Sequence, residues 1–560
     1  MRTIYRLILL MSMLVYLTGC SIMDSPEEGA CHGDGVWLKL ILSMDNGDTG
    51  ATRTPAAGED GDGREAGTAN ENAIKTLSLF FYKPSGDGGL NSPWSTKITA
   101  TAQINVISSE STWNGTTFEC LVNIKTGVPA NGDRVAVIAN HKFSASRLAQ
   151  IKTLGKLRDI TLDVPYTVSD NGIPADYTDF VMTSANSDDG IVVTNTAGTY
   201  ADPYITQVTI QRMAARIDFW YNEKQNDASK ITAGADRELV YPVKRSVDGK
   251  TQEVATAYLT HIVPFNVMQK GAWLFKRTTR QGEVEQSDLD IKNLIICGKE
   301  LTKADVAVDE QIADNLVVEP HTITKRTASS STLFDWYGDT FLTHVKEDLE
   351  AACNASRPIP ELMARAVKKT DSTFPEFNRA FCLTYANENT ESPAKYYFSL
   401  QGGKMDPSYA TGLLFRVEYV PKTVYFYTNE QLIQGNYNRG ENFWRYKKDG
   451  EELFFTSQES ALGYCQDKGL DYAKYVKKYD NGVCYYQERL YHCNVGTVST
   501  GLAIGDKPMQ YATVRNNIYR VGVQFKGIGK TADSEPETDN IRLIVKTRKW
   551  NFRRMDEIKF

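Results

Sequence analysis

Short runs in which apolar and polar residues alternate recur along most of this chain, and their two-residue period predicts β-strands. From residue 74 onward, turn signals rich in glycine, proline and aspartate separate these runs, a spacing that favours β-sandwich domains. The 29 tyrosines and 22 phenylalanines strengthen the prediction, because aromatic side chains suit the half-buried surface of a sheet. We therefore predict a mainly β fold of two β-sandwich domains with short helices and insertions.

The clearest alternating run covers residues 36–44. Residues 45–72, which follow it, are rich in Gly, Ala, Thr, Asp and Glu, have no apolar pattern, and contain Arg53 and Arg64. This composition predicts an exposed loop that is open to proteases, so the first strand is expected to be separable from the body of the protein. The apolar side chains that share one face of this first strand are Val36, Leu38, Leu40, Leu42 and Met44.

The carboxyl end repeats this arrangement. Residues 530–540 form a polar linker, and residues 541–550 then form a strand-like run with a basic, solvent-friendly side. A lone strand next to a polar segment is thus predicted at both ends of the chain. The predicted inward face and end of the last strand comprise Ile541, Leu543, Val545, Thr547 and Trp550.

The length of 560 residues allows two to four domains of ordinary size. A polar interval near residues 222–236 predicts a boundary between an N-terminal sandwich over 54–230 and a C-terminal sandwich over 231–560. Residues 144–159 are the first predicted helix, and an insertion near 437–473 has no assigned role. The net charge of −6 argues against a nucleic-acid partner, which would require a basic surface.

The first twenty residues have the pattern of an export signal. Arg2 and Arg6 precede an apolar stretch from Leu7 to Leu17 that is too short to span a bilayer with ease. The sequence Leu17-Thr18-Gly19-Cys20 resembles the lipobox of bacterial lipoproteins. The resemblance implies that residues 1–19 are a signal peptide and that Cys20 is lipidated, so membrane attachment would rest on the lipid.

No pattern in the chain predicts catalysis, a cofactor or a metal. The six histidines are scattered, and neither a His-Glu-x-x-His motif nor a Gly-x-Ser-x-Gly turn is present. Cys465, Cys484, His492 and Cys493 do not have the spacing of a zinc site, and buried structural cysteines or a single disulfide are the favoured interpretation. The sequence leaves open whether any cysteines pair.

Several short motifs occur in the order typical of one family. The chain resembles the fimbrillins, or type V pilins, of Bacteroidales, and is most similar to minor-fimbrium shaft subunits with a fimbrillin C-terminal domain. The motifs are the Val-rich strand 134–140, the Met-Thr element 179–183, the Arg-x-x-Ala-Arg strand 212–216, the Glu-Asn-Thr element 385–390, and a C-terminal block of 484–486, 514–519 and Trp550.

This resemblance implies a structural subunit of a fimbrium, and not an enzyme. It implies two transthyretin-like or Greek-key sandwiches, and travel to the outer membrane as a lipoprotein. An arginine-specific protease would remove residues 20–53, with their first strand acting as a plug, by cutting after Arg53, or after Arg64 as a second choice. The terminal strand 541–560 of a neighbouring subunit would then fill the open groove and build a polymer for adhesion and biofilm formation.

The implied partners are identical or related subunits, together with anchor and tip subunits of the same fimbrium. Two alternatives stay open. The first is a tip or accessory adhesin that binds a host glycan or protein, and that would need a groove but no working donor strand. The second is a glycan-binding surface lipoprotein. The candidate aromatic platforms for sugar stacking are Trp94, Trp113, Trp336 and Trp444. Core or edge packing is the simpler interpretation of these tryptophans.

Overall fold

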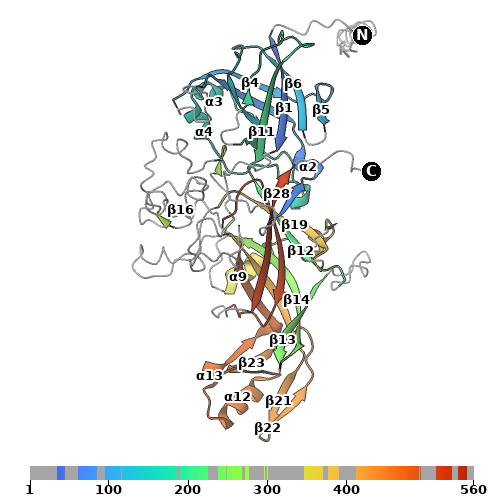
Figure 1. Ribbon diagram of the computed structural model, residues 1–560. Coiled ribbons are helices and arrows are strands. Elements are labelled where there is room, and N and C mark those ends of the chain that lie inside the picture. Colours follow the sequence, from blue (N-terminus) through green and yellow to red (C-terminus); the bar gives the residue numbers. More distant parts are fainter. Residues whose placement is uncertain are drawn as a thin grey trace, which may run out of the picture.

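A computed structural model of the chain confirms the mainly β fold class (Figure 1). Several parts of the sequence prediction lie outside the described residues: the signal segment 1–19, Cys20 and the residues up to 34, residues 45–60 with Arg53, Trp94, Trp336, Cys493, and residues 552–560 of the predicted donor strand. The structure describes residues 35–44, 61–84, 95–114, 117–185, 190–224, 238–247, 249–267, 272–276, 295–296, 299–300, 346–369, 376–389, 411–490, 492, 512–532 and 540–551.

The N-terminal part is a nine-stranded sheet in the order β4-β3-β7-β9-β11-β1-β6-β5, with β10 paired to β7. Alternate side chains of its strands point into one core, which packs β1, β6 and β11 against β3 and β7. The strands are β1 (Val36–Met44), β3 (Thr76–Tyr82), β4 (Ile98–Asn105), β5 (Ser111–Asn114), β6 (Thr117–Ile124), β7 (Arg134–Ala139), β9 (Met182–Ser184), β10 (Gly190–Ile191) and β11 (Tyr204–Arg212).

Two short helices cover the outer face of β3 and β7. The sequence predicted one helix over residues 144–159, but the structure has α3 (Ala145–Gln150) and α4 (Leu154–Arg158) instead. The Thr153 side chain accepts a hydrogen bond from the Lys156 amide and so starts a new helix at that point. Leu157 packs in a second apolar cluster with Phe80 and Ile138, which project from the opposite face of the sheet to the main core.

The C-terminal part is a sandwich of two sheets with one large core between them. One sheet has six strands in the order β18-β19-β12-β27-β28-β2, and the other has four in the order β13-β14-β20-β26. These strands are β18 (Val367–Lys368), β19 (Arg379–Ala386), β12 (Ala215–Tyr221), β27 (Asn517–Phe525), β28 (Ile541–Asn551), β2 (Gly61–Ala66), β13 (Leu239–Val247), β14 (Lys250–Phe265), β20 (Gly412–Pro421) and β26 (Val483–Arg489).

The chain enters this second sandwich earlier than the sequence predicted. The expected boundary lay at residue 230, but β11 ends in the nine-stranded sheet at Arg212 and β12 begins in the six-stranded sheet at Ala215. The strand β2 also joins the six-stranded sheet, although it lies far toward the amino end of the chain. The predicted N-terminal domain over 54–230 therefore contributes two strands to the C-terminal sandwich.

The predicted insertion near 437–473 is part of a larger unit. Residues 424–479 fold between β20 and β26 into a five-stranded sheet in the order β22-β21-β24-β23-β25, at the end of the molecule opposite the nine-stranded sheet (Figure 1). The helix α12 packs on one face of that sheet. The elements are β21 (Val424–Thr428), β22 (Gln431–Gly435), β23 (Phe443–Lys448), β24 (Glu451–Phe455), α12 (Gln458–Asp467), α13 (Tyr472–Tyr475) and β25 (Val476–Tyr479).

Short elements complete the described chain. Strand β15 (Ala272–Trp273) pairs with β8 (Thr161–Leu162), so a segment that follows β14 docks against the helical side of the nine-stranded sheet. The others are α2 (Ala69–Asn72), η1 (Ser108–Glu110), η2 (Pro174–Asp176), β16 (Ile295–Ile296), β17 (Lys299–Glu300), α9 (Lys346–Ala355), α10 (Ile359–Met363) and η5 (Asp480–Gly482).

The buried face of β1 leads to a stability prediction. We expect Leu40→Ala to destabilise the nine-stranded sheet by about 2–5 kcal/mol, because it removes a fully buried side chain and leaves a cavity. Ile41→Ala on the half-buried opposite face is the matched control and should cost clearly less. Urea unfolding, with hydrogen exchange used to identify the transition of this sheet, measures both. Equal losses for the two variants would contradict the inward orientation of Leu40.

Candidate functional site

The first strand fills a position between two long neighbours. β1 runs antiparallel to β6, from Val36 opposite Ile124 onward, and parallel to β11, from Leu38 opposite Tyr204 onward. Leu38, Leu40 and Leu42 are fully buried, Met44 is 3% exposed, and Val36 is half-buried. The predicted inward face of this strand is therefore confirmed. Without β1, the two neighbouring strands would border an apolar groove with unpaired backbone edges.

The outer face of β1 is also held. The Trp37 ring meets the Tyr200 ring edge-on with centroids 4.9 Å apart, and the Lys39 ammonium lies 2.7 Å from the Glu119 carboxylate on β6. Side chains on both faces and hydrogen bonds on both edges therefore hold this strand. The sequence predicted an isolated strand, whereas the folded β1 is an interior strand of the largest sheet.

The last strand completes its own domain in this structure. β28 pairs antiparallel with β27 over nine residue pairs, from Phe525 opposite Ile541 to Asn517 opposite Lys549. The partly buried side chains of Ile541, Leu543 and Val545 pack against the core of the C-terminal sandwich, as their alternation predicted. Thr547 and Trp550 lie in the same strand. The expectation of a lone terminal strand is thus wrong for the isolated subunit.

Residues 61–72 belong to the segment expected to be an exposed loop, but they form regular structure. Residues 61–66 form β2, which runs parallel to β28 with Arg64 opposite Lys549 and Glu65 opposite Trp550. The short helix α2 follows, where the Thr68 hydroxyl accepts from the Glu71 amide and the Glu71 carboxylate accepts from the Thr68 amide at 2.6 Å. Arg64 therefore lies in a paired strand, and the prediction of a loop over 45–72 is wrong for 61–72.

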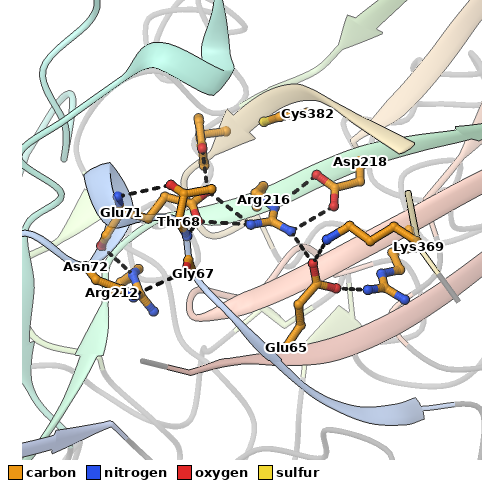
Figure 2. Close-up of polar contacts among 12 residues, drawn as sticks. Glu65, Gly67, Thr68, Glu71, Asn72, Arg212, Arg216, Asp218, Lys369 and Cys382 are labelled. Atoms are coloured by element: carbon orange, nitrogen blue, oxygen red, sulfur yellow. Dashed lines mark hydrogen bonds and ion pairs between the residues drawn. The ribbon is translucent and has the colours of Figure 1, made fainter. Parts of the chain in front are cut away.

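A buried charge cluster holds residues 61–72 where the nine-stranded sheet meets the six-stranded sheet (Figure 2). At its centre is Arg216 of β12, which is 4% exposed. Its Nη1 donates to both carboxylate oxygens of Glu71, at 3.0 and 3.1 Å. Its Nε and Nη2 each donate to Asp218 at 2.9 Å, and Nη2 also donates to Glu65 at 2.8 Å. One guanidinium thus contacts three carboxylates, two of which belong to residues 61–72.

Glu65 also forms ion pairs with two other basic side chains near or in the six-stranded sheet. Its carboxylate accepts hydrogen bonds from Lys369, just after β18, and from Arg520 of β27, in addition to Arg216. The Arg520 guanidinium also lies 4.6 Å from the centroid of the Trp220 ring. Glu65 is only 9% exposed, so these contacts are largely shielded from bulk solvent. Ionic interactions are stronger in the protein interior than in water.

Arg212, at the end of β11, ties the cluster to the nine-stranded sheet. Its Nε donates to the Glu71 carbonyl at 3.0 Å, and its guanidinium also donates to the Asn72 side chain. Its backbone amide donates to the Asn516 side chain at 3.2 Å, just before β27. The point at which the chain crosses between sheets is therefore pinned by polar contacts on both sides.

The electrostatics of the cluster favour the ionised form of Glu71. Burial alone would raise the pKa of Glu71, but the pKa lies below its ordinary value of 4.5 because Arg216, the Tyr385 hydroxyl and Arg212 favour the carboxylate. The Tyr385 hydroxyl lies 2.6 Å from that carboxylate, and burial raises its own pKa far above 10, so it stays protonated. Burial likewise raises the pKa of the neighbouring Cys382 thiol and keeps it neutral.

Sequence reasoning did not identify Glu65, Glu71, Asp218, Lys369 or Arg520 as members of one site. Two signals for part of it were present. Thr68-x-x-Glu71 has the spacing of a capping box, which would have indicated a helix start in the supposed loop. Arg212 and Arg216 interrupt long apolar strands, and a buried arginine requires a partner. Nothing local in the sequence indicates which carboxylates those partners are.

The remaining candidate chemistry has structural explanations. Within the described residues, no group of three or more histidine, cysteine, aspartate or glutamate side chains could hold a metal ion. Cys465 and Cys484 are buried free thiols, and His492 is hydrogen-bonded through Nδ1 to the Tyr519 hydroxyl at 2.8 Å. In the part of the chain that the structure describes, no helix is long and apolar enough to cross a membrane.

The two described tryptophans among the proposed sugar platforms pack against protein. Trp113 is half-buried and meets the Phe118 ring edge-on with centroids 5.1 Å apart. Trp444 packs against the core of the insertion unit. Core packing therefore accounts for both residues, as the simpler interpretation predicted.

Comparison with known families confirms the fimbrillin resemblance. Residues 42–237 match the family model described as major fimbrial subunit protein (FimA), and residues 477–550 match the C-terminal region of fimbrillin, described as major fimbrial subunit protein type IV. Both families comprise structural fimbrial subunits and not enzymes. The charge cluster joins the two regions, since Glu65, Glu71 and Arg216 lie in the first and Arg520 lies in the second.

Solved structures of fimbrial proteins are similar only at low identity. The tip fimbrial protein Mfa3 from Porphyromonas gingivalis, with a C-terminal truncation, is 11% identical with a TM-score of 0.33, and the match covers 92% of this chain and 99% of that one. A fimbrillin (FimA) from Porphyromonas gingivalis W83 is 13% identical with a TM-score of 0.32, covering 92% and 99%. No curated protein matches the chain.

The cluster predicts a specific loss of stability. We expect Glu71→Gln to destabilise the protein near pH 7 by about 3–5 kcal/mol, because it leaves Arg216 buried with less compensating charge. Glu119→Gln, which breaks the partly exposed pair with Lys39, is the control and should cost about 0–1 kcal/mol. Urea unfolding of both variants measures the difference. Similar costs for the two would show that the cluster is not an essential buried ion network.

The same variant predicts a pH dependence. The folded pKa of Glu71 is depressed, so its contribution is complete above its ordinary value of 4.5 and is lost as pH falls through the folded pKa. The difference in unfolding free energy between the wild type and Glu71→Gln should therefore be constant at neutral pH and shrink below about pH 4.5. A series of urea titrations from neutral to acidic pH tests this, and a difference that grows on acidification would contradict the assigned sign.

Proposed function

We propose that this chain, whose two matched regions are those of the fimbrillins, is a structural fimbrial subunit that polymerises by donor-strand exchange. It is exported as a lipoprotein through Cys20, and an arginine-specific protease at the outer membrane cuts it after Arg53. It then joins identical or related subunits in a surface fimbrium that supports adhesion and biofilm formation. The two matched fimbrillin regions support the fimbrial role and a surface appendage, and the processing steps are the new proposal.

The observation that carries this proposal is the position of β1 between β6 and β11. The segment that links β1 to β2 contains Arg53, so a cut there would leave the first strand held by non-covalent contacts alone. Loss of the strand would expose an apolar groove, at a cost of about 1.5–3 kcal/mol for each large side chain that β1 had buried. Such a groove is strongly driven to bind a replacement strand.

The terminal strand has a matching pattern. Ile541, Leu543, Val545 and Thr547 repeat with the same two-residue period as Leu38, Leu40, Leu42 and Met44. A donated β28 could therefore point four side chains into the groove while its backbone pairs with both neighbouring strands. Groove and donor lie on different parts of the surface, so the contact is heterologous and forms an open chain of subunits.

This pattern favours a polymerising subunit over the alternatives. A tip adhesin requires the groove but no working donor, whereas β28 has an uninterrupted apolar face. A glycan-binding lipoprotein requires exposed aromatic platforms, whereas Trp113 and Trp444 are packed against cores. Anchor and tip subunits, and a host glycan or protein receptor, are then partners of the assembled fimbrium.

The processing steps predict the ends of the mature protein. Protein recovered from the surface of its own cells should start at Thr54 and form a heat-resistant ladder on a non-reducing gel. Arg53→Ala should retain the start at Cys20 and abolish the ladder. Arg64→Ala should leave both unchanged, because Arg64 lies within the paired strand β2. A wild-type protein that starts at lipidated Cys20 and stays monomeric would overturn the proposal.

Peptide competition tests the groove without disturbing the fold. Deleting residues 541–560 also removes a core strand of the C-terminal sandwich, so loss of the ladder would be ambiguous. A peptide of residues 36–44, added in excess during cleavage, should occupy the groove and suppress the ladder. The same peptide with Leu40 and Leu42 changed to lysine is the matched control. Equal ladders with both peptides would exclude the β1 groove as the acceptor.

A further inference from the structure

We propose that residues 61–72, called here the clasp, lock β28 into its own sheet and that the clasp must open before β28 can leave. The inference rests on the proposed function, since it concerns the regulation of the donor strand. It assigns a role to a segment that the exchange mechanism otherwise leaves as a simple connection between the cut and β3.

The strand pairing shows what the clasp covers. β28 has β27 on one side along nine residue pairs. On its other side lies β2, the last strand of the sheet, which pairs from Gly61 opposite Thr547 to Ala66 opposite Asn551. The final part of β28 is therefore an interior strand, and its outer edge is available for new pairing only after β2 has moved.

The side-chain contacts of Glu65 extend beyond the strand next to it. In the order β12-β27-β28-β2, Glu65 stands on β2 but bonds Arg520 on β27 and Arg216 on β12. The pair with Arg520 crosses β28, and the pair with Arg216 crosses both β28 and β27, so both pairs join β2 to strands on the other side of β28. The strand cannot leave sideways without separating β2 from these cations or passing beneath the Glu65 side chain.

The other end of the clasp is fixed as firmly. Glu71 accepts two hydrogen bonds from Arg216, and Asn72 accepts from Arg212 (Figure 2). Glu71 also accepts a hydrogen bond from the Tyr385 hydroxyl. The capping box holds α2 in shape between these anchors and β2. Within the clasp, β2 pairs with β28, whereas Glu71 of α2 is bonded to Arg216 and Tyr385, so the clasp can open at β2 while α2 stays attached.

The position of the clasp in the chain connects it to cleavage. Before the cut, β2 is tethered through residues 45–60 to β1 in the nine-stranded sheet, so both ends of the clasp are held. After a cut at Arg53, β2 lies close to a free chain end, and a strand with a free end can peel away from its neighbour. The one cut would thus free the plug and also loosen the lock on the donor strand.

Hydrogen exchange of the uncleaved monomer tests the lock. In Glu65→Gln, the amides of β28 should exchange about ten- to 100-fold faster than in the wild type, because the ion pairs across the strand are lost. Glu223→Gln, which breaks a half-exposed ion pair with Arg379 in the same sheet, is the matched control and should leave that exchange unchanged. Wild-type exchange of β28 in a folded Glu65→Gln protein would overturn the proposal.

A reversible staple provides a test that retains the buried charges. Ala66 and Asn551 are direct register partners, so Ala66→Cys combined with Asn551→Cys can form a disulfide between β2 and β28. The oxidised, cleaved protein should form at least about tenfold less ladder than the reduced protein, because stapled β28 cannot be donated. Equal ladders in both states would also overturn the proposal.

The two readouts separate this inference from the proposed function. Exchange of β28 in the monomer does not require polymerisation, so it reports on the lock alone. A reduced and cleaved protein that never forms a ladder would refute donor-strand exchange, whatever the exchange rates are. Fast exchange in Glu65→Gln together with no ladder would therefore retain the lock and reject the polymer.

Discussion

The fold of the C-terminal sandwich depends on the ion pairs that balance the charge of one buried guanidinium group. Arg216 is nearly inaccessible to solvent, and its charge is balanced by Asp218 on its own strand and by Glu65 and Glu71 from a distant part of the chain. An uncompensated charge at this depth is strongly destabilising, so Glu71 of α2 must stay in place while Arg216 is buried, and Glu65 adds a further partner in the closed subunit. This constraint fixes where β2 lies, which strand it covers, and where the two sheets meet.

Strands with alternating apolar and polar residues could be predicted from the sequence, but the strands and side chains that they contact could not. The inward faces of β1 and β28 follow directly from their two-residue period. The cluster could not be derived in this way, because Glu65 and Arg520 are separated by 455 positions and neither stands in a distinctive motif. The loop prediction for residues 61–72 was wrong because polar composition hid two carboxylates that are buried by ion pairing and a helix that begins with a capping box.

The domain boundary was misplaced for a related reason. The polar interval after residue 222 is visible in composition, but the change of sheet occurs between two buried strands, at Arg212 and Ala215. The C-terminal sandwich is therefore built from mixed parts of the chain: β2 and β12 from the amino-terminal half share a sheet with β27 and β28. Such non-local pairing makes the six-stranded sheet slow to assemble, because the paired strands β2 and β28 come from opposite ends of the protein.

The two-sided pairing of the first strand has a mechanical consequence. A strand that occupies the place of β1 is hydrogen-bonded along both edges, antiparallel to β6 and parallel to β11. Tension applied along such a strand loads all of these bonds in shear, and many must break together before it slides out. A strand attached along one edge and pulled from its end would open one bond at a time. Linkages formed at this position therefore resist pulling far better than their individual hydrogen-bond energies suggest.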